Sequence, residues 1–310
     1  MSNILIIKHG SLGDLIQANG AIKDIKNFYP NRKVFLLTTQ PYSIFMSECP
    51  YLDGVLIDKR LPRWNLFYLN NLKKTLLKYD FSKVFDLQNS SRTKFYKRFI
   101  IKNVEWSSTE TALEPGQKKK DFDQDPVLDR IEIQIKKSGI QTEFTKNIDL
   151  SWAIENISRL VKQYANNEYI LLFPFCSPKL KNKKWPYFKE LIQKLKQEFK
   201  NKYPILLAPG PNEIKEAIEL NGKVVLEDNE PINIKKLISL INNAKFIIAN
   251  DTGPAHIASH LDKKGLVLFG GHTSAEKVSI ENFNFKAISV KNLKDLNVEI
   301  VMEEIKAKLN

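Results

Sequence analysis

The polar turn Lys8-His9-Gly10-Ser11-Leu12-Gly13-Asp14 follows the first apolar run of the chain and holds its first candidate for chemistry. Gly10 and Gly13 allow the backbone to bend closely between a strand and a helix, and Asp14 stands at the helix start. The third glycine of a dinucleotide-binding turn is absent, and a carboxylate at a helix N-terminus would repel a pyrophosphate. We therefore expect Asp14 to face a cleft as a carboxylate, with a structural helix cap as the alternative.

The segment Asn250-Asp251-Thr252-Gly253-Pro254-Ala255-His256 has the residue types of an anion-binding turn. It follows an expected strand at residues 245–249 and precedes an expected helix rich in small residues. Free backbone amides at a helix N-terminus attract phosphate, and the helix dipole adds to that attraction. The segment therefore predicts a phosphate site, whereas a capped turn with a buried structural His256 is the alternative.

The loop Ser177-Pro178-Lys179-Leu180-Lys181-Asn182-Lys183-Lys184-Trp185-Pro186 gathers four lysines before a Trp-Pro helix start. Several ammonium groups beside a helix N-terminus could neutralise a departing diphosphate, which is the work of a divalent metal in other enzymes. No cluster of metal ligands stands out in the sequence, and Cys49 and Cys176 lie far apart without a CxxC neighbour. We therefore expect neither a metal, nor a cofactor, nor a disulfide.

Two further polar segments lie near expected strand ends. Asp86-Leu87-Gln88-Asn89-Ser90-Ser91-Arg92 follows the apolar residues 84–85, and ligands of parallel sheets bind at the carboxyl ends of the strands. Lys59-Arg60-Leu61-Pro62-Arg63-Trp64 clusters three cations with an aromatic ring. The first segment is expected to line the cleft, and a solvated loop is the alternative for the second.

These segments need a scaffold of strands and helices that holds them in place. Short apolar runs bounded by turn residues alternate with segments of helical period, which predicts an α/β fold with parallel sheets. Both halves begin with a strand, a polar turn and a helix, so we expect two Rossmann-like domains. Helices are expected from about Asp14 to Phe28 and from starts near Pro186, Asn212 and Asn233. The expected strands lie at residues 4–7, 34–37, 55–57, 84–87, 170–173, 205–207, 246–249 and 266–269.

A chain of 310 residues fits two domains of roughly 150 residues each. We place them at residues 1–166 and 167–292, followed by an amphipathic helix at 293–310 that packs back across the junction. Residues 107–147 contain Glu114-Pro115-Gly116 and Lys118-Lys119-Lys120 and are expected to form a mobile loop. Residues 151–164 have helical period and lead into the strand at 170–173.

Lys and Arg exceed Asp and Glu by 13 residues, which favours polyanionic partners such as nucleic acid, anionic lipid or phosphorylated substrates. A solvated, lysine-rich surface is the alternative explanation. No apolar run approaches the roughly 18 residues that span a bilayer, and no secretory pattern begins the chain, so we expect a cytoplasmic protein. Aromatic residues are not interleaved with cations, and no nucleic-acid recognition motif is present, which argues against nucleic acid as the partner.

Taken in order, Gly10-Ser11-Leu12-Gly13-Asp14, Asp86-Leu87-Gln88, Lys183-Lys184-Trp185-Pro186 and Asn250-Asp251-Thr252-Gly253-Pro254-Ala255-His256 resemble the ADP-heptose:lipopolysaccharide heptosyltransferase family, glycosyltransferase family 9. The resemblance covers nearly the whole chain. It implies a GT-B fold, in which two Rossmann-like parallel-sheet domains face a central cleft. It also implies an inverting, metal-independent transfer of heptose from ADP-heptose to a lipopolysaccharide core or related surface-glycan acceptor.

The resemblance assigns a role to each segment. Asp14 matches the family's catalytic aspartate, the proposed general base. The implied donor-binding residues are Ser177, Lys183, Lys184, Asp251, Thr252, Gly253 and His256. The implied acceptor-binding residues are Gly13, Lys59, Arg60, Arg63, Trp64, Gln88 and Arg92. The implied partners are a nucleotide sugar, a phosphorylated glycolipid and the anionic cytoplasmic face of the inner membrane, and we expect a monomer.

The chain departs from the family pattern at three points around the expected donor site. Asn89 stands where members often carry glycine, Pro174-Phe175-Cys176-Ser177 replaces Pro-Gly-Ala-Ser, and Phe269-Gly270-Gly271-His272-Thr273 replaces Tyr-Gly-Pro-Thr. A GT-B glycosyltransferase with another nucleotide sugar is therefore a second interpretation. A basic nucleic-acid-binding protein and a non-catalytic protein that keeps the fold are further alternatives.

Overall fold

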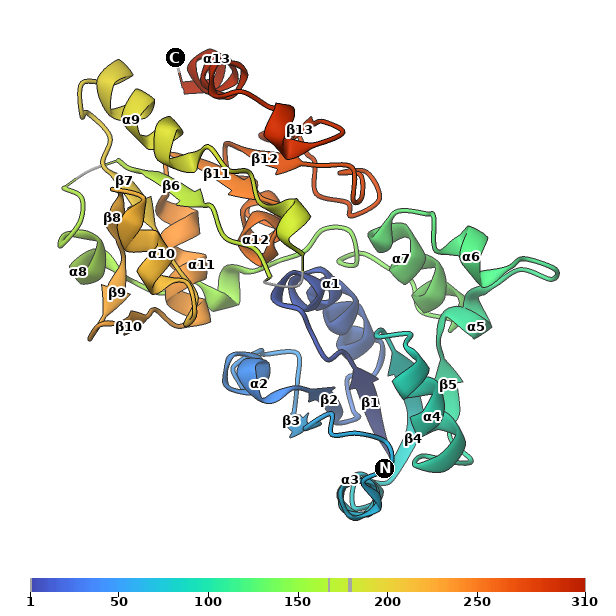
Figure 1. Ribbon diagram of the computed structural model, residues 1–310. Helices are drawn as coiled ribbons and strands as arrows, with labels where there is room; N and C mark the ends of the chain where they lie inside the picture. The colour runs from blue at the N-terminus through green and yellow to red at the C-terminus, as the bar shows by residue number, and fades with distance from the viewer. Residues whose placement is uncertain (1, 167, 178–179, 310) are drawn as a thin grey trace. The chain divides into compact units, whose positions relative to one another are not determined.

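The computed structural model describes residues 2–166, 168–177 and 180–309 of the chain. The chain forms two compact units, Met1–Trp152 and Ala153–Asn310 (Figure 1). The boundary thus lies after Trp152 rather than at residue 166, because the segment that follows is bonded within the second unit. There the hydroxyl of Tyr164 donates to the carbonyl of Leu226 at 3.0 Å.

The first unit is built on a five-stranded parallel sheet in the order β3-β2-β1-β4-β5. Two of its inner strands, β1 and β2, contain the continuous apolar runs 4–7 and 34–37, as expected for strands that are buried on both faces. The strands are β1 Asn3–Ile7, β2 Val34–Thr38, β3 Gly54–Ile57, β4 Phe81–Asp86 and β5 Glu105–Ser107.

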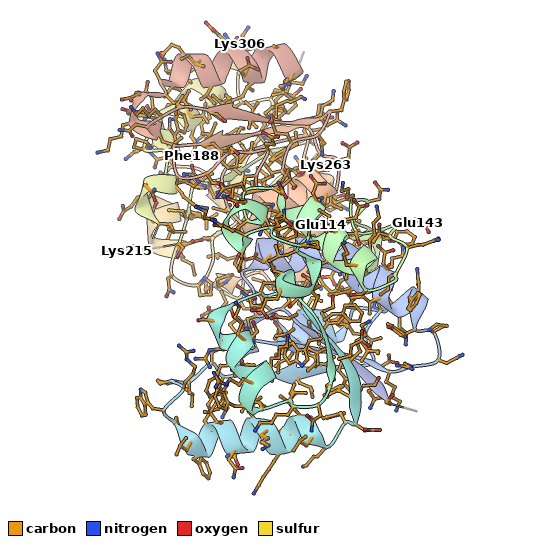
Figure 2. All side chains as sticks on the ribbon, turned by 90° about the vertical axis from the view of Figure 1, so that its right-hand side faces the viewer. Glu114, Glu143, Phe188, Lys215, Lys263 and Lys306 are labelled. Atoms are coloured by element: carbon orange, nitrogen blue, oxygen red, sulfur yellow. The ribbon has the colours of Figure 1, made fainter. Side chains whose placement is uncertain are left out.

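Helices cover both faces of this sheet. Side chains alternate along β1, and Leu5 and Ile7 point into a cluster that includes residues of α3 and α4. Ile4 and Ile6 point to the opposite face and are equally buried. In Figure 2, α3 is the light-blue helix at the lower edge, and side chains project from its inner and its outer face. The helices are α1 Leu12–Phe28, α2 Gln40–Ser47, α3 Leu66–Leu77, α4 Ser91–Phe99, α5 Thr109–Ala112, α6 Lys119–Phe122 and α7 Val127–Lys137.

The second unit is built on a six-stranded parallel sheet in the order β13-β12-β11-β6-β7-β8, with a small antiparallel pair, β9 and β10, beside it. The strands are β6 Ile170–Phe173, β7 Ile205–Leu207, β8 Lys223–Val224, β9 Leu226–Glu227, β10 Glu230–Pro231, β11 Phe246–Asn250, β12 Gly265–Phe269 and β13 Phe285–Ser289. The helices are α8 Ser158–Val161, α9 Phe188–Glu198, α10 Ile214–Glu219, α11 Ile234–Asn243, α12 Gly253–His260 and α13 Val298–Leu309, with 3-10 turns η1 Ser151–Ala153, η2 Lys181–Lys183 and η3 Leu293–Asp295.

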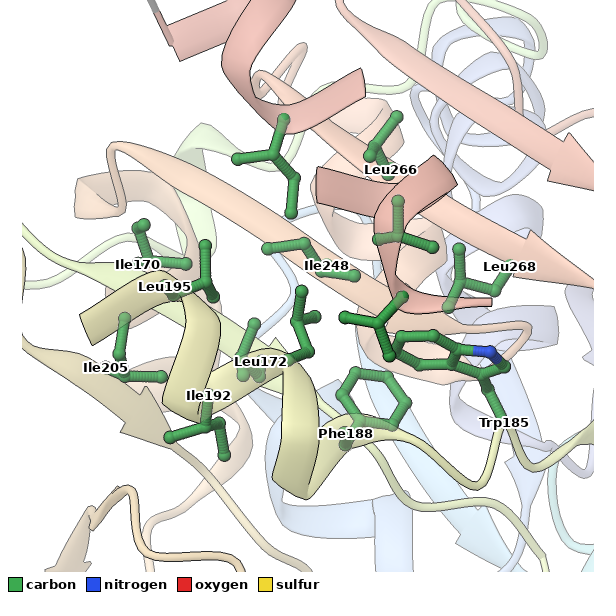
Figure 3. Close-up of a cluster of buried hydrophobic side chains, with 14 of the residues drawn as sticks. Ile170, Leu172, Trp185, Phe188, Ile192, Leu195, Ile205, Ile248, Leu266 and Leu268 are labelled. Carbon is green, nitrogen blue, oxygen red and sulfur yellow. The ribbon is translucent and has the colours of Figure 1, made fainter. Parts of the chain in front are cut away.

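The core of the second unit lies between its sheet and the helices α9 and α13. Figure 3 shows Leu172, Ile248 and Leu268 of the strands facing Trp185 and Phe188 at the start of α9. Helix α13 contacts α9 and β12 and contributes to the same core. The C-terminal helix, expected as a separate segment at 293–310, therefore belongs to the second unit.

The expected α/β fold is confirmed, but the interpretation of residues 107–147 as a mobile loop is wrong. This stretch contains α5, α6 and α7. Leu128, Ile131 and Ile135 are buried at the spacing of one face of α7, and the charged residues between them obscure that period. None of the described helices combines the length and the apolar composition needed to cross a membrane.

Candidate functional site

Both sheets have a point at which the order of the strands reverses. In the first unit the chain continues from β1 to β2 on one side and places β4 on the other; in the second unit β6 has β7 and β11 as neighbours in the same way. Ligands of open parallel sheets bind outside the carboxyl ends of the strands at such a switch point. The polar segments after β1 and β4, and those after β6 and β11, lie at these two places.

Asp14 lies in the first turn of α1, whose N-cap is Ser11. One carboxylate oxygen, Oδ2, accepts hydrogen bonds from the amide of Ser11 at 2.8 Å and from its hydroxyl at 2.9 Å. The other oxygen, Oδ1, lies 3.3 Å from Nζ of Lys8, and the side chain is 41% exposed. Asp14 thus contributes to the helix cap and also presents an ion-paired carboxylate to solvent.

The electrostatic surroundings keep Asp14 ionised. Burial acts to raise the pKa of this carboxyl, but the ammonium of Lys8 and the hydrogen bonds from Ser11 outweigh burial, so the pKa lies below its ordinary value. A carboxylate that is ionised at neutral pH and open to solvent can accept the proton of a hydroxyl that binds within hydrogen-bond distance.

The turn before Asp14 is tied to the end of β4. Nζ of Lys8 donates to the carbonyl of Leu87 at 3.1 Å, and the amide of His9 donates to Oε1 of Gln88 at 2.9 Å. Gln88, expected as an acceptor ligand, is therefore an anchor of the turn through its side-chain oxygen. These two bonds fix the backbone that positions the carboxylate.

Two positions in these turns have left-handed backbone. Gly10 has φ +114°, and a Cβ there would lie 2.4 Å from the ring of Tyr42, so only glycine fits. Asn89 has φ +49°, a conformation that asparagine tolerates better than most residues with a side chain. The departure from the family's glycine at position 89 therefore preserves the turn after β4.

A buried carboxylate, Asp58, joins the end of β1 to the loop after β3. It accepts hydrogen bonds from the hydroxyl of Tyr68, from the hydroxyl of Tyr96 at 2.7 Å and from the amide of Arg60 at 2.7 Å. Nε2 of His9 lies 2.9 Å from its Oδ2. Burial would raise the pKa of Asp58, but these donors outweigh it and lower the pKa to about 2.

Replacement of Asp58 with asparagine is expected to lower the free energy of unfolding by about 2 kcal/mol at neutral pH. The folded pKa of about 2 lies below the ordinary 3.8, so this contribution is present above 3.8 and is lost as the pH falls towards 2. Urea unfolding of the wild type and the variant checks it, and the difference between them should shrink on acidification. A difference that stays constant from neutral to acidic pH would contradict this account.

The structure brings three of the expected acceptor-binding arginines to one place. Nη2 of Arg92 donates to the carbonyls of Arg60 at 3.2 Å and Leu61 at 2.9 Å. The guanidinium of Arg63 lies 5.9 Å from the centre of the ring of Phe95 on α4. The loop after β3 and the start of α4 therefore form one cationic surface.

The remaining acceptor-binding predictions fall on two different environments. Lys59 and Trp64 are exposed in the loop after β3, and the side chain of Trp64 is free of the core. Gly13 is buried in the first turn of α1, directly before Asp14. Gly13 thus belongs to the turn at the end of β1, whereas Lys59 and Trp64 belong to the cationic surface.

In the second unit Asn250, the last residue of β11, clamps the lysine-rich loop at both ends. Nδ2 donates to the carbonyl of Pro174 at 2.8 Å, and Oδ1 accepts from the amide of Trp185 at 3.1 Å. The buried indole of Trp185 in turn donates to the carbonyl of Leu296 at 2.8 Å. The end of this loop is therefore fixed next to β11.

The clamp places Lys183 against Asp251. Nζ of Lys183 lies 2.5 Å from Oδ2 of Asp251, whose side chain is only 3% exposed. Nε2 of His272 lies 3.0 Å from the same oxygen, and Nε2 of His256 lies 3.8 Å from Oδ1. Of the expected donor-binding residues, the structure thus brings together Lys183, Asp251 and His256.

The carboxylate at this centre stays ionised. Burial acts to raise the pKa of Asp251, but the ammonium of Lys183 and the two imidazoles outweigh burial and lower it. Asp251 directly precedes Thr252, the N-cap of α12, and Gly253 is the first residue of that helix. The first amides of a helix have no acceptor within it, so an ammonium and amide donors lie around one point at the end of β11.

Two expected donor ligands lie outside this centre. Lys184 forms an ion pair with Glu216 on α10 and therefore does not share Asp251 with its neighbour. Ser177 is exposed, and its carbonyl accepts from the amide of Leu180 at 2.8 Å. Pro178 and Lys179 of the same predicted loop lie outside the described residues.

Sequence reasoning missed two polar contacts of the candidate sites, Lys8 with Asp14 and His272 with Asp251. Both residues follow a strand, Lys8 after β1 and His272 after β12, so the rule that polar residues gather at strand ends could have found them. His272 also borders an open pocket of about 860 Å³. The pocket is lined by Asn182, Lys184, Gly270, Gly271, His272, Lys291, Asn292, Leu293, Lys294 and Asp295.

Known proteins are similar to this chain in sequence and in fold. A family model described as glycosyltransferase family 9 (heptosyltransferase) matches residues 69–302. Lipopolysaccharide heptosyltransferase 1 of Campylobacter coli is 24% identical in an alignment that covers 91% of this chain and 87% of that protein.

Two solved structures from E. coli share the fold. Heptosyltransferase WaaC with ADP-2-deoxy-2-fluoro heptose has a TM-score of 0.74 at 19% identity and covers 98% of this chain and 99% of its own. ADP-heptose lps heptosyltransferase II has a TM-score of 0.73 at 16% identity, with coverage of 99% and 98%. The expected GT-B class, with two Rossmann-like parallel-sheet domains, is confirmed.

Proposed function

Because the chain belongs to glycosyltransferase family 9, the heptosyltransferase family, we propose that it transfers a heptose from ADP-heptose to a lipopolysaccharide-core type acceptor. The observation that carries the proposal is the pair of Lys183 and Asp251 beside the start of α12. An ammonium next to helix amides suits the diphosphate of a nucleotide sugar. The similar E. coli enzyme WaaC was solved with ADP and with ADP-2-deoxy-2-fluoro heptose, which supports this donor class.

We assign the role of general base to Asp14. In the transfer the acceptor hydroxyl oxygen bonds to the anomeric carbon while the bond from that carbon to the diphosphate oxygen breaks. The hydroxyl proton must leave as the new bond forms, and an ionised carboxylate within reach accepts it. The ion pair with Lys8 favours the ionised form of the Asp14 carboxyl, so this group can accept a proton as soon as the acceptor binds. Attack from the face opposite the leaving group inverts the configuration.

Lys183 and the amides at the start of α12 stabilise the negative charge that develops on the departing ADP. Asp251 positions Lys183, and His272 and His256 in turn contact Asp251. We propose that these groups replace a divalent cation, so that the reaction needs neither a metal nor a cofactor. Within the ranges that the structure describes, no group of three His, Cys, Asp or Glu side chains is arranged to hold a metal ion.

The acceptor that fits the cationic surface of the first unit is a phosphorylated glycolipid. Arg60, Arg63 and Arg92 offer guanidinium groups that match phosphate geometry. Such an acceptor is anchored in a bilayer, so the proposed site of action is the cytoplasmic face of the inner membrane. We propose that the protein acts there as a peripheral monomer.

Incubation with labelled ADP-heptose and a truncated lipopolysaccharide core tests the function. Mass analysis is expected to show an acceptor that has gained one heptose, together with free ADP. ADP should inhibit the reaction more strongly than UDP or GDP at the same concentration. If another nucleotide sugar is consumed and ADP-heptose is not, the donor assignment fails, and the second interpretation, a family member with a different donor, takes its place.

A further inference from the structure

The start of α3 and the loop before it expose large apolar side chains. Trp64 is 80% exposed, Leu66 75% and Phe67 79%. Three such neighbours on one surface are unusual for a soluble monomer and mark a site of contact with a partner or a membrane. We call Trp64, Leu66 and Phe67 the apolar tip.

The apolar tip is held in its exposed position by the rest of the unit. The side chain of Asn65 caps α3 by accepting from the amide of Tyr68 at 2.9 Å. Tyr68, Leu69 and Leu72 on the inner face of α3 belong to the buried core. Arg92 fixes the carbonyls of the preceding loop. Because these contacts fix both the loop and the helix, the tip cannot fold back into the core.

The apolar tip lies within a segment of one charge. Residues 59–79 contain six Lys and Arg and no Asp or Glu. Lys74 and Lys78 are exposed and follow Phe67 at helical spacing, so they continue the outer face of α3. This outer face is the one that points away from the sheet in Figure 2.

We propose that the apolar tip and the cations of residues 59–79 form a docking surface for an anionic phospholipid bilayer. Trp64, Leu66 and Phe67 would enter the interfacial region of the bilayer while the lysines and arginines contact lipid phosphates. The proposal deepens the proposed function and rests on its lipid-anchored acceptor, which the cationic loop before the tip would meet at the same surface.

The same features argue against other occupants. A second copy of the chain would set cations against cations in a symmetric contact, which costs free energy. A single-stranded nucleic acid could stack on aromatic rings, but the aliphatic Leu66 offers no stacking surface. Aromatic and aliphatic side chains together, with flanking lysines, are typical of segments that lie in a membrane interface.

Sedimentation of the full chain with vesicles measures the docking directly. We expect binding to vesicles of phosphatidylcholine with one third phosphatidylglycerol, and much weaker binding to phosphatidylcholine alone or at high salt. The double variant Leu66→Gln/Phe67→Gln should lower the partition coefficient about tenfold, because the apolar area that enters the interface is lost. Lys74→Glu/Lys78→Glu should lower it at least about thirtyfold at low salt, because two cations are lost and two anions are gained.

Phe283→Gln is the matched control. Phe283 is 89% exposed, but it lies in the second unit, outside the docking surface, so its replacement should leave partition unchanged. The proposal would be overturned if the wild-type protein did not bind anionic vesicles. It would also be overturned if the Leu66→Gln/Phe67→Gln variant bound them as tightly as the wild type. Binding to a single-stranded oligonucleotide that this variant abolishes would assign the surface to nucleic acid instead.

The vesicles carry no sugar, so the docking result is independent of transfer. Transfer of heptose to a deacylated, soluble core should be unaffected by Leu66→Gln/Phe67→Gln, since neither side chain belongs to the candidate sites. Vesicle binding without transfer would contradict the proposed function alone. Transfer without vesicle binding would contradict the docking surface alone.

Discussion

Replacement of Asp14 with asparagine is expected to lower kcat roughly 100-fold to 10,000-fold and to change the KM for the donor by less than about threefold. Asparagine keeps an oxygen that can accept from Ser11, so the start of α1 should survive. It cannot take up a proton, so the step that removes the hydroxyl proton loses its base. Steady-state kinetics with both substrates measure the two constants.

The control for this variant is Asp129→Asn. Asp129 also lies in the first turn of a helix, α7, and also pairs with a lysine, Lys146, but it is far along the chain from the turn at β1. Its replacement should leave kcat within about twofold of wild type, as is usual for an exposed ion pair. Equal losses in the two variants would show that the effect of Asp14 is one of stability rather than catalysis.

The pH dependence of kcat gives an independent check on Asp14. The pKa of this carboxyl lies below its ordinary value of 3.8, so the base is ionised throughout the neutral range. We therefore expect kcat to fall only when the pH drops below about 3.8, the pKa of a free aspartic acid side chain. A decline that begins near neutrality and disappears in Asp14→Asn would mean that the base has a raised pKa, contrary to the geometry with Lys8.

Replacement of Lys183 with alanine is expected to lower kcat/KM for the donor roughly 100-fold to 1,000-fold, the usual range for loss of one preorganised group at a developing negative charge. Both constants should change, because in the proposed mechanism the ammonium contacts the diphosphate before and during its departure. Lys184→Ala is the comparison, since that ammonium pairs with Glu216. Its effect should be at least about tenfold smaller.

Lys183→Ala also leaves the buried carboxylate of Asp251 without its nearest cation, which costs stability. The double variant Lys183→Ala/Asp251→Asn removes that carboxylate charge and should restore the melting temperature. If the double variant also regains wild-type kcat/KM, the role of Lys183 is structural. If it folds well and remains defective, Lys183 acts on the donor.

Much of the scaffold follows from local sequence. Runs such as residues 170–173 and 246–249 are apolar throughout and therefore predict buried parallel strands, which the structure contains as β6 and β11. Strands without a continuous apolar run gave no such signal. β5 is Glu-Trp-Ser, and β13, at the edge of its sheet, is Phe-Lys-Ala-Ile-Ser. Local composition cannot distinguish such strands from loops.

The sequence predicts which segments form the candidate sites, but it does not predict which side chains contact one another there. Strand ends and turn residues identify Asp14, Lys183 and Asp251 as polar groups at the carboxyl edges of sheets. The choice between adjacent lysines was not predictable, because the clamp from Asn250 and the position of Glu216 decide it in three dimensions. The network of Asp58 likewise joins residues that are distant in sequence.

The proposed mechanism assigns proton removal to Asp14 and donor binding to Lys183. Calorimetric titration of ADP into the wild type, Asp14→Asn and Lys183→Ala tests it most directly. We expect Asp14→Asn to bind ADP with the wild-type Kd, and Lys183→Ala to bind it at least about tenfold more weakly. Unchanged affinity in Lys183→Ala, or a loss confined to Asp14→Asn, would contradict the proposed mechanism.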